Sequence, residues 1–336
     1  MSWLAVDIGG ANLKLADRTT FAMTRAFAMW KHPHQLSTQL QEMLASAPAH
    51  RNLAVTMTGE LADCFTTKAD GVQFILHQVL RALPTDWQSR VYLTDGRLVS
   101  IRAALAEPLA AAASNWHALA AFAGRFVPHG RAMMIDIGST TCDLIPLVDG
   151  RPAPLGRNDT ARMLAGQLLY TGVERAPICA VLDRVPYRGA SCPPAQEWFA
   201  TMRDAYLVLG EIEEQPACCE TADGRPATRQ AARARLARMI CADASQFDQT
   251  DAEVMARAAA GAQAKRLAGA FLQAAATIVP ETVVGAGHGD YLLRRMLKIV
   301  GFEGPIIWLA DRLNPAVSRV ATAHALAVLA CERHGT

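Results

Sequence analysis

The chain of 336 residues carries one short motif twice. AVDIGGANLKLA runs from Ala5 to Ala16, and MMIDIGSTTCDLIPL runs from Met133 to Leu147. In each copy an apolar strand ends in Asp-Ile-Gly, and small polar residues lead into a second strand. Glycines in such a turn let backbone N–H groups approach an anion, and a carboxylate at the strand end can hold Mg²⁺. The duplication predicts two related domains that face each other across a phosphate group.

The two loops supply most of the expected phosphate and metal ligands. Asp7 and Asp136 are the predicted magnesium ligands and part of the catalytic set. Asn12 and Lys14 lie on the first hairpin, where Lys14 could reach a phosphate or point to solvent. Asp143 is either a further metal carboxylate or simply a hairpin residue. The residues expected to cradle phosphate through N–H and hydroxyl groups are Gly9, Gly10, Gly138, Ser139, Thr140 and Thr141.

Two polar turns outside the loops also carry candidate residues. Glu60 follows a strand in MTGELAD and is the candidate general base or a ligand of a substrate amine, with a surface carboxylate as the competing interpretation. In YTGVERAP, Thr171, Gly172 and Arg175 could form an anion-binding turn, because arginine offers a bidentate fork to carboxylate or phosphate.

A Gly-rich turn forms the third element of the pattern. VVGAGHGDYLL runs from Val283 to Leu293, with a strand before the glycines and a helix after them. Gly285 and Gly287 would let a flat ring or a phosphate lie against the backbone. His288 is a catalytic acid–base group or a polar residue that lines the site. Taken alone, the segment would be an ordinary turn between a strand and a helix.

Composition excludes several classes of protein. Hydrophobic residues make up 51% of the chain and its formal net charge is +2, so charge gives no case for nucleic acid or an anionic membrane as partner. No apolar run reaches transmembrane length, and the N-terminus enters a core strand without a signal-peptide pattern. The eight cysteines include no C-x-x-C pair, which favours reduced thiols over a zinc site. We therefore expect a cytoplasmic protein.

Hydrophobic patterning places these motifs in two similar cycles of elements. The first cycle has expected strands at 3–8, 13–16, 25–30, 52–56, 90–93 and 98–100, and expected helices at 35–47, 70–83 and 114–126. The second has expected strands at 132–137, 143–148, 281–285 and 305–309, a loop at 187–194, and expected helices at 160–169, 196–209, 229–240, 251–278, from 290, and at 316–331. The predicted domains are 1–126 plus 316–336, and 131–309 with a helical insertion at about 187–278.

The order of two loops, a Gly-rich turn and an Ala-rich last helix resembles the actin, sugar-kinase and heat-shock-chaperone superfamily. That resemblance implies an α/β fold of two actin-like (ribonuclease H-like) lobes, with mixed sheets flanked by helices and a phosphate-binding cleft between the lobes. In the superfamily the two loops grip a nucleotide tail, and the Gly-rich turn meets its adenosine.

Further motifs narrow the resemblance. FATMRDAYLVLGEI resembles the Thr-x-x-Asp-Ala…Leu-Gly stretch of the hydantoinase/oxoprolinase family, and DIGSTTCDL resembles its Asp-x-Gly-x-Thr-x-x-Asp loop. MTGELAD and LLYTGVERAPICA are similar to a smaller, stand-alone group within it, the tetrahydromethanopterin-linked one-carbon transfer pathway proteins, which include the archaeal methanofuran-biosynthesis synthase. The resemblance implies a transferase that joins an aminomethylfuran methyl diphosphate to the phenol of a glutamyltyramine or tyrosine-like acceptor and releases diphosphate.

Two other functions stay open at this stage. An ATP-dependent small-molecule kinase would use the same loops, although the usual mid-chain catalytic Asp ahead of a Gly-rich helix N-terminus is not evident. A non-enzymatic nucleotide-binding scaffold would not need the two polar turns. Mg²⁺ is the expected cofactor, ATP is the alternative ligand, and small molecules rather than nucleic acid or membrane are the expected partners. The sequence leaves a homodimer open.

Overall fold

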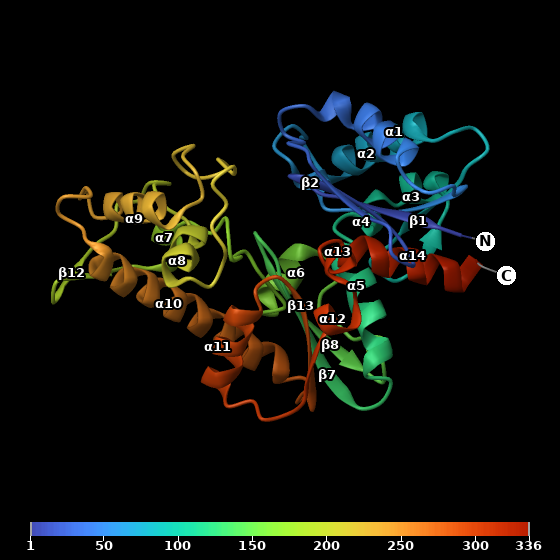
Figure 1. Ribbon diagram of the computed structural model, residues 1–336. Coiled ribbons are helices and arrows are strands. Elements are labelled where there is room, and N and C mark those ends of the chain that lie inside the picture. Colours follow the sequence, from blue (N-terminus) through green and yellow to red (C-terminus); the bar gives the residue numbers. More distant parts are fainter. Residues whose placement is uncertain (1, 335–336) are drawn as a thin grey trace.

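Each lobe of the computed structural model, which describes residues 2–334, is built on one mixed sheet (Figure 1). The first sheet has the order β3-β2-β1-β4-β5-β6. Strands β1, β2 and β3 are antiparallel neighbours, whereas β4 and β5 continue the sheet parallel to β1. Its strands are β1 (Leu4–Ile8), β2 (Asn12–Asp17), β3 (Ala22–Ala26), β4 (Asn52–Met57), β5 (Gln88–Tyr92) and β6 (Leu98–Val99).

The second sheet repeats this topology in the order β10-β8-β7-β13-β14. Again three antiparallel strands are followed by two parallel ones. The strands are β7 (Arg131–Ile137), β8 (Cys142–Val148), β10 (Leu168–Leu169), β13 (Thr282–Gly287) and β14 (Ile306–Trp308), and β9 (Arg151–Pro152) pairs with β8. Both sheets thus have the ribonuclease H-like order, which confirms the predicted actin-like α/β fold.

Helices cover both faces of the first sheet. One face packs against α1 (Leu36–Ala45), α2 (Lys68–Ala82), α3 (Ile101–Ala106) and α4 (Pro108–Ala111). The other face packs against α14 (Ala321–His334), which returns from the end of the chain through contacts such as Trp3 with Leu326. The amphipathic spacing of α2 explains its burial, and Thr67 and Asp70 fix its start as a capping box.

Helix α5 (Asn115–Ala123) crosses to the second sheet. Its Trp116, Leu119 and Phe122 lie in one cluster with Met134 and Val284 of that sheet. Ala118 of α5 also lies in the cluster that contains Trp3 and Leu326 of the first lobe. The helix thus packs on both lobes, because it is apolar on several sides and lies between the second sheet and α14 (Figure 1), and the domain boundary at residue 126 stays a prediction.

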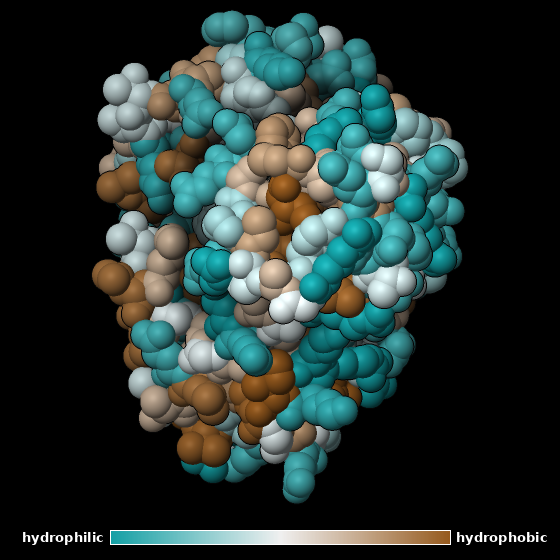
Figure 2. All heavy atoms as spheres, turned by 90° about the vertical axis from the view of Figure 1, so that its left-hand side faces the viewer, coloured by the Kyte–Doolittle hydropathy of each residue, from teal (hydrophilic) through white to brown (hydrophobic). Residues whose placement is uncertain are grey.

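The helical insertion packs along one long helix, α10 (Gln249–Ala275) (Figure 1). Its apolar side chains share one core with the second sheet, and helix α11 (Asp290–Val300) packs beside α10. Figure 2, which looks onto the insertion side, shows a mostly hydrophilic face with separate apolar groups. The remaining insertion elements are α7 (Ile178–Val181), β11 (Val185–Tyr187), β12 (Ala190–Cys192), α8 (Met202–Leu209) and α9 (Arg229–Arg238).

Several predicted boundaries were wrong for local reasons. The helix predicted at 160–169 ends early as α6 (Asp159–Leu164), because Gly166 adopts a φ of 69° and β10 follows. The loop predicted at 187–194 is a hairpin whose turn has positive φ at Arg188 and Gly189. The helix predicted from 196 begins only after its cap, Thr201.

Two further boundaries differ at the ends of the lobes. The third strand was predicted at 25–30 and lies at Ala22–Ala26. The closing helix predicted at 316–331 is divided into α13 (Pro315–Ser318) and α14, and α12 (Leu309–Arg312) precedes them. Short 3₁₀ turns occupy Pro33–Gln35, Gly59–Leu61 and Gly124–Phe126. Among residues 2–334, no helix combines the length and apolar character needed to cross a membrane.

A buried network of ion pairs is expected to stabilise the fold of the insertion. The guanidinium of Arg235, which is 0% exposed, donates from Nε to Asp204 Oδ1 at 2.8 Å and from Nη1 to Asp223 Oδ1 at 3.0 Å. Arg235→Ala should lower the free energy of unfolding by about 3–5 kcal/mol, because it leaves the buried Asp204 charge without its partner. Urea denaturation measures this loss. The exposed Arg229→Ala is the matched control, and equal losses in both variants would contradict the assignment.

Candidate active site at the junction of the lobes

The two Asp-Ile-Gly turns have the same backbone geometry. In the first, the N–H of Gly9 donates to the carbonyl of Asn12 at 2.9 Å, and in the second the N–H of Gly138 donates to Thr141 at 2.9 Å. Each turn joins the first two strands of its sheet at the same position. The sequence duplication is therefore a structural duplication.

The first turn is held by the segment that contains Glu60. The N–H of Thr58 donates to the carbonyl of Ile8 at 2.9 Å, and Gly59 packs so closely that an added Cβ would lie 3.1 Å from the carbonyl oxygen of Gly9. On its other side, the N–H of Met29 donates to Gly10 at 2.9 Å. The MTGELAD motif therefore packs against the first turn and supports its conformation.

The YTGVERAP segment holds the second turn in the same way. The N–H groups of Glu174 and Arg175 donate to the carbonyl of Ser139 at 3.1 and 3.0 Å. A Cβ at Gly172 would come within 2.3 Å of the Ser139 carbonyl carbon, so no other residue fits there without a shift. Thr171 is buried, and its hydroxyl accepts a hydrogen bond from Gln263 at 2.8 Å. Thr171 and Gly172 thus support the loop, and Arg175 at the end of the segment is exposed.

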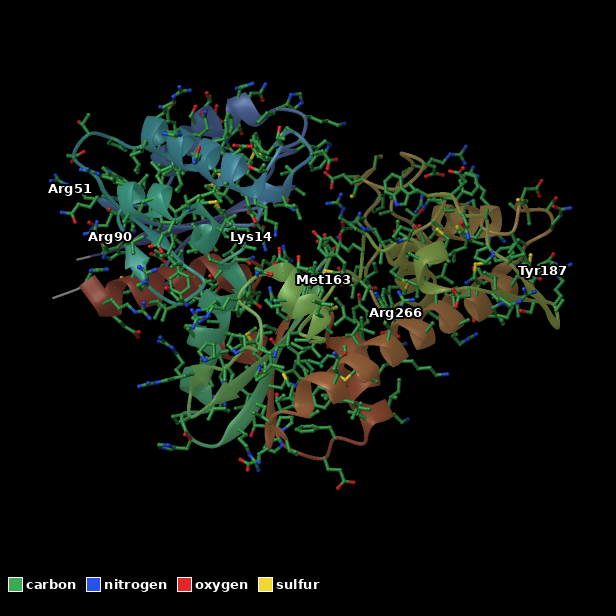
Figure 3. All side chains as sticks on the ribbon, turned by 180° about the vertical axis from the view of Figure 1, so that it is seen from behind. Lys14, Arg51, Arg90, Met163, Tyr187 and Arg266 are labelled. Carbon is green, nitrogen blue, oxygen red and sulfur yellow. The ribbon has the colours of Figure 1, made fainter. Side chains whose placement is uncertain are left out.

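Four charged residues lie near Asp136. Asp7 and Lys14 are cross-strand neighbours in the first hairpin, as Asp136 and Asp143 are in the second. Burial raises the pKa of Asp136 to about 6, and the charges of Asp143 and Asp7 add to this while Lys14 and His288 oppose it. Lys14 lies on the side of the first lobe that faces the second (Figure 3). The structure thus brings residues of both predicted loops and of the Gly-rich turn to one place.

The carboxylate of Asp7 is only half satisfied. Its Oδ2 accepts a hydrogen bond from the Thr322 hydroxyl at 2.6 Å, whereas Oδ1 is buried without a partner. Among residues 2–334, no group of three or more His, Cys, Asp or Glu side chains could hold a metal ion. Magnesium commonly binds through one or two carboxylates together with substrate phosphates and water. Asp7 and Asp136 fit that pattern of ligands.

Asp143 has a different environment from Asp7. Its carboxylate forms an ion pair with Arg162, a buried residue whose guanidinium lies 4.1 Å from the ring centroid of Trp116. Burial raises the pKa of Asp143, and the charge of Arg162 opposes this rise. Asp143 is therefore paired with a buried cation. The sequence analysis did not predict Arg162 or Trp116 as its neighbours.

Glu60 is 1% exposed, which excludes the interpretation as a surface carboxylate. Its Oε2 is buried without a hydrogen-bond partner. Burial raises the pKa of Glu60 to about 7; the charge of Asp159 raises it further and that of Lys68 lowers it. Lys68 Nζ lies 3.3 Å from Asp159 Oδ2 and links α2 of the first lobe to α6 of the second. Gly71 of α2 leaves room for the Glu60 backbone, since a Cβ there would lie 2.3 Å from the Glu60 carbonyl oxygen.

The Gly-rich turn lies directly beside Asp136. Gly287 has a φ of 81°, and an added Cβ would lie 2.7 Å from Asp136 Oδ1. His288 donates its backbone N–H to the carbonyl of Ile137 at 3.1 Å, and its Nε2 lies 3.2 Å from Glu174 Oε1. At Gly285 the nearest neighbour is the Trp308 ring, which occupies the space that a side chain would need.

Glu174 connects the Gly-rich turn to the insertion. Besides His288 it forms an ion pair with Arg203 of α8. Burial alone would raise the pKa of Glu174, but hydrogen bonding to His288 and the charge of Arg203 outweigh it and lower the pKa to about 2. Glu174 lies inside YTGVERAP, but the sequence analysis did not select this residue.

Two exposed side chains, Leu61 and Tyr170, lie near Glu60. Leu61 follows Glu60 in the chain, and Tyr170 is 60% exposed. Partial burial raises the pKa of the Tyr170 phenol, and the negative charges of Asp159 and Glu60 raise it further. Met163 of α6 is also exposed (Figure 3). The guanidinium carbon of Arg175 lies 5.9 Å from the ring centroid of Trp30, so the two lobes also meet there.

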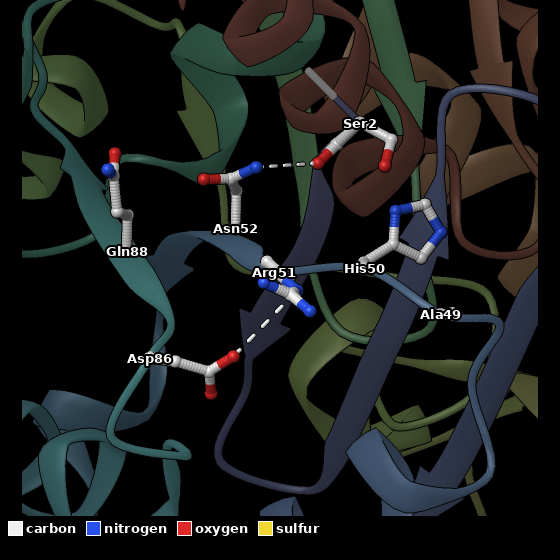
Figure 4. A pocket seen from close by; sticks show the side chains of 7 residues that line it. All are labelled: Ser2, Ala49, His50, Arg51, Asn52, Asp86 and Gln88. Atoms are coloured by element: carbon white, nitrogen blue, oxygen red, sulfur yellow. Dashed lines mark hydrogen bonds and ion pairs between the residues drawn. The ribbon is translucent and has the colours of Figure 1, made fainter.

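Two surface cavities lie away from these residues. One of about 470 Å³ lies at the edge of the first sheet, where Asn52 donates to the carbonyl of Ser2 at 2.9 Å and Arg51 faces Asp86 at 3.8 Å (Figure 4). The other, of about 620 Å³, lies beside the end of α10. Neither is lined by a predicted site residue, so size alone does not identify the chemical site.

Two lobes with ribonuclease H-like sheets and paired Asp-Ile-Gly hairpins define the class as actin-like α/β proteins. The sequence model of the hydantoinase/oxoprolinase family matches residues 51–327, and the chain belongs to this family. The match spans both lobes and the insertion, and it confirms the resemblance seen in the sequence motifs.

Two curated relatives share one name. The "(4-{4-[2-(gamma-L-glutamylamino)ethyl]phenoxymethyl}furan-2-yl)methanamine synthase" of Methanocaldococcus jannaschii is 33% identical over 245 residues, which cover 71% of this chain and 72% of that protein. The protein of that name from Methanococcus vannielii is 34% identical over 115 residues, 34% of this chain and 51% of that protein.

Two solved structures are similar to the chain only at low identity. An inorganic polyphosphate/ATP-glucomannokinase from Arthrobacter sp. strain KM is 11% identical with a TM-score of 0.48, and the match covers 99% of each chain. A ROK hexokinase from Thermus thermophilus is 12% identical with a TM-score of 0.46, covering 99% of this chain and 100% of the other. Similarities of this size carry no information about substrates.

The burial of Glu60 predicts a specific pH dependence of stability. Its pKa rises from 4.5 to about 7 on folding, so the folded state binds the extra proton between these values and loses stability as pH rises through about 7. Gln does not titrate. Relative to wild type, Glu60→Gln should therefore gain about 2–3 kcal/mol in free energy of unfolding between about pH 5 and about pH 8.

Urea denaturation of both proteins at the two pH values measures this gain. The exposed Glu197→Gln provides the control, and it should follow the wild-type pH dependence. Parallel curves for Glu60→Gln and wild type would show that Glu60 is not buried in the way described.

Proposed function

We propose that this chain is a transferase that joins an aminomethylfuran methyl diphosphate to the phenol oxygen of a glutamyltyramine or tyrosine-like acceptor. One observation carries the proposal: a buried carboxyl, Glu60, lies next to the first of the two Asp-Ile-Gly turns, with the exposed side chains of Leu61 and Tyr170 near it. Its 33% identical relative is named for an aryl ether in which a phenoxymethyl group joins a furan. A base beside a phosphate site is what formation of such an ether requires.

The reaction balances with the groups present. The phenol oxygen attacks the furan methylene carbon, the bond from that carbon to the diphosphate oxygen breaks, and the phenol proton passes to the Glu60 carboxylate. A furfuryl carbon tolerates positive charge, so stabilising the leaving diphosphate supplies much of the catalysis. Mg²⁺, when bound, would neutralise charge that develops on the diphosphate.

Each residue then has a defined task. Asp7 and Asp136 would hold the metal, and the two turns would present backbone and hydroxyl donors to the diphosphate. Lys14 adds a positive charge near Asp136. With its pKa raised to about 7, Glu60 is both partly ionised at neutral pH and a stronger base than an ordinary carboxylate. Asp143 remains the partner of Arg162.

The metal-holding role of the two aspartates is tested by removing their charge. Asp7→Asn and Asp136→Asn should each lower kcat/KM by about 10²–10³-fold, because Asn keeps the volume but not the charge that Mg²⁺ needs. Steady-state rates across a magnesium titration measure the effect, with the exposed Asp183→Asn as control. Near wild-type activity in both variants, with folding confirmed by circular dichroism, would contradict the assignment.

The reaction itself separates a transferase from a kinase. Incubated with a furfuryl-type diphosphate, a phenolic acceptor and Mg²⁺, the protein should release diphosphate and form the ether without ATP, as mass spectrometry would detect. Glu60→Gln should slow ether formation more than it weakens diphosphate binding, since a base acts on the acceptor. Strict dependence on ATP, with ADP and a phosphorylated product, would replace this proposal by the kinase alternative.

A further inference from the structure

Trp30 and Arg175 are fastened to opposite phosphate loops. Arg175 donates its backbone N–H to Ser139 in the second turn at 3.0 Å. Trp30 follows Met29, whose N–H donates to Gly10 in the first turn at 2.9 Å. The guanidinium carbon of Arg175 lies 5.9 Å from the ring centroid of Trp30, within the range of a cation–π contact. The pair therefore spans the junction of the lobes at the level of the loops.

Most other charges around this pair are engaged within the protein. Glu174 pairs with Arg203 and His288, Lys68 pairs with Asp159, and Arg162 pairs with Asp143. Across residues 2–334, none of the ion pairs involves Arg175, which is exposed. Its guanidinium is therefore available to an external anion.

The position of Tyr170 relates Arg175 to the base. Beyond the effect of burial, the charges of Asp159 and Glu60 raise the pKa of the Tyr170 phenol and that of Arg175 lowers it. Arg175 and Glu60 thus act on the same exposed aromatic side chain. Tyr170 and Arg175 also belong to the same YTGVERAP segment, so both are within reach of a ligand that binds beside Glu60.

We propose that Arg175, held across Trp30, binds the carboxylate at the far end of the phenolic acceptor, while Trp30 and Tyr170 contact its apolar part. The inference rests on the proposed transferase function. The glutamylamino group in the relative's name carries such a carboxylate, and a tyrosine-like acceptor carries one as well. A guanidinium fork pairs with a carboxylate through two parallel hydrogen bonds, and stacking on an indole ring fixes its orientation.

Binding to the full-length protein tests this without turnover. Isothermal titration with γ-glutamyltyramine, with tyramine and with Mg²⁺-diphosphate compares three ligands, only the first of which carries a carboxylate. Arg175→Ala should weaken γ-glutamyltyramine binding by about 10- to 100-fold and change the other two by less than about twofold. Arg175→Lys should fall between, because it keeps the charge but loses the fork.

Two further variants sharpen the result. Trp30→Ala should weaken both phenolic ligands, and Arg51→Ala, at the edge of the first lobe (Figure 3), should change none of the three. Loss of Mg²⁺-diphosphate affinity in Arg175→Ala would overturn the proposal and assign Arg175 to the leaving group. Equal losses for tyramine and γ-glutamyltyramine would also overturn it. If wild type forms the ether and Arg175→Ala binds γ-glutamyltyramine as tightly as wild type does, only this inference is refuted. If wild type binds neither acceptor, the proposed transferase function is refuted as well.

Discussion

The geometry of the site depends on the backbone hydrogen bonds that fasten each Asp-Ile-Gly turn. In both turns one glycine N–H closes the hairpin, and a neighbouring segment docks onto the outer carbonyls. The lack of space for a Cβ at Gly172, beside Ser139, shows how tightly that docking is constrained. Because Glu60 and Arg175 belong to the segments that make these contacts, the two turns also determine where the candidate base and the candidate anion ligand lie.

Charge burial at the junction follows a consistent pattern. Buried or half-buried ions such as Arg162 and Glu174 have partners of opposite sign, which offsets the free energy lost on leaving water. Glu60 Oε2 and Asp7 Oδ1 are two carboxylate oxygens that are buried without a hydrogen-bond partner, a group of atoms that also includes Nε of Arg162. Unsatisfied buried polar atoms are costly in a folded protein, and each calls for a physical reason. For Glu60 and Asp7, the roles proposed for them, a base and a metal ligand, would supply that reason.

The fold and the segments that form the candidate site could be predicted from the sequence, but the ion pairs between side chains of the site could not. Duplicated turns can be recognised because glycine and aspartate at fixed spacing act locally. The pairing of Arg162 with Asp143, or of Glu174 with His288, joins residues far apart in the chain, and no periodicity records it. The early end of α6 follows from one glycine in a left-handed conformation. The packing of α5 against the second sheet depends on tertiary contacts, which the local sequence of the helix does not specify.

The insertion acts on the second loop through a buried chain of hydrogen bonds. The Tyr206 hydroxyl of α8 donates to Gln263 Oε1 at 2.5 Å, and Gln263 Nε2 of α10 donates to Thr171 Oγ1 and to the carbonyl of Gly172. The Thr-x-x-Asp-Ala stretch that precedes Tyr206 caps α8, and its Asp204 is fixed by Arg235. A motif remote from the loops in sequence is therefore physically a support for them. This gives a physical reason why the Thr-x-x-Asp-Ala stretch and the Asp-Ile-Gly turns occur in the same chain.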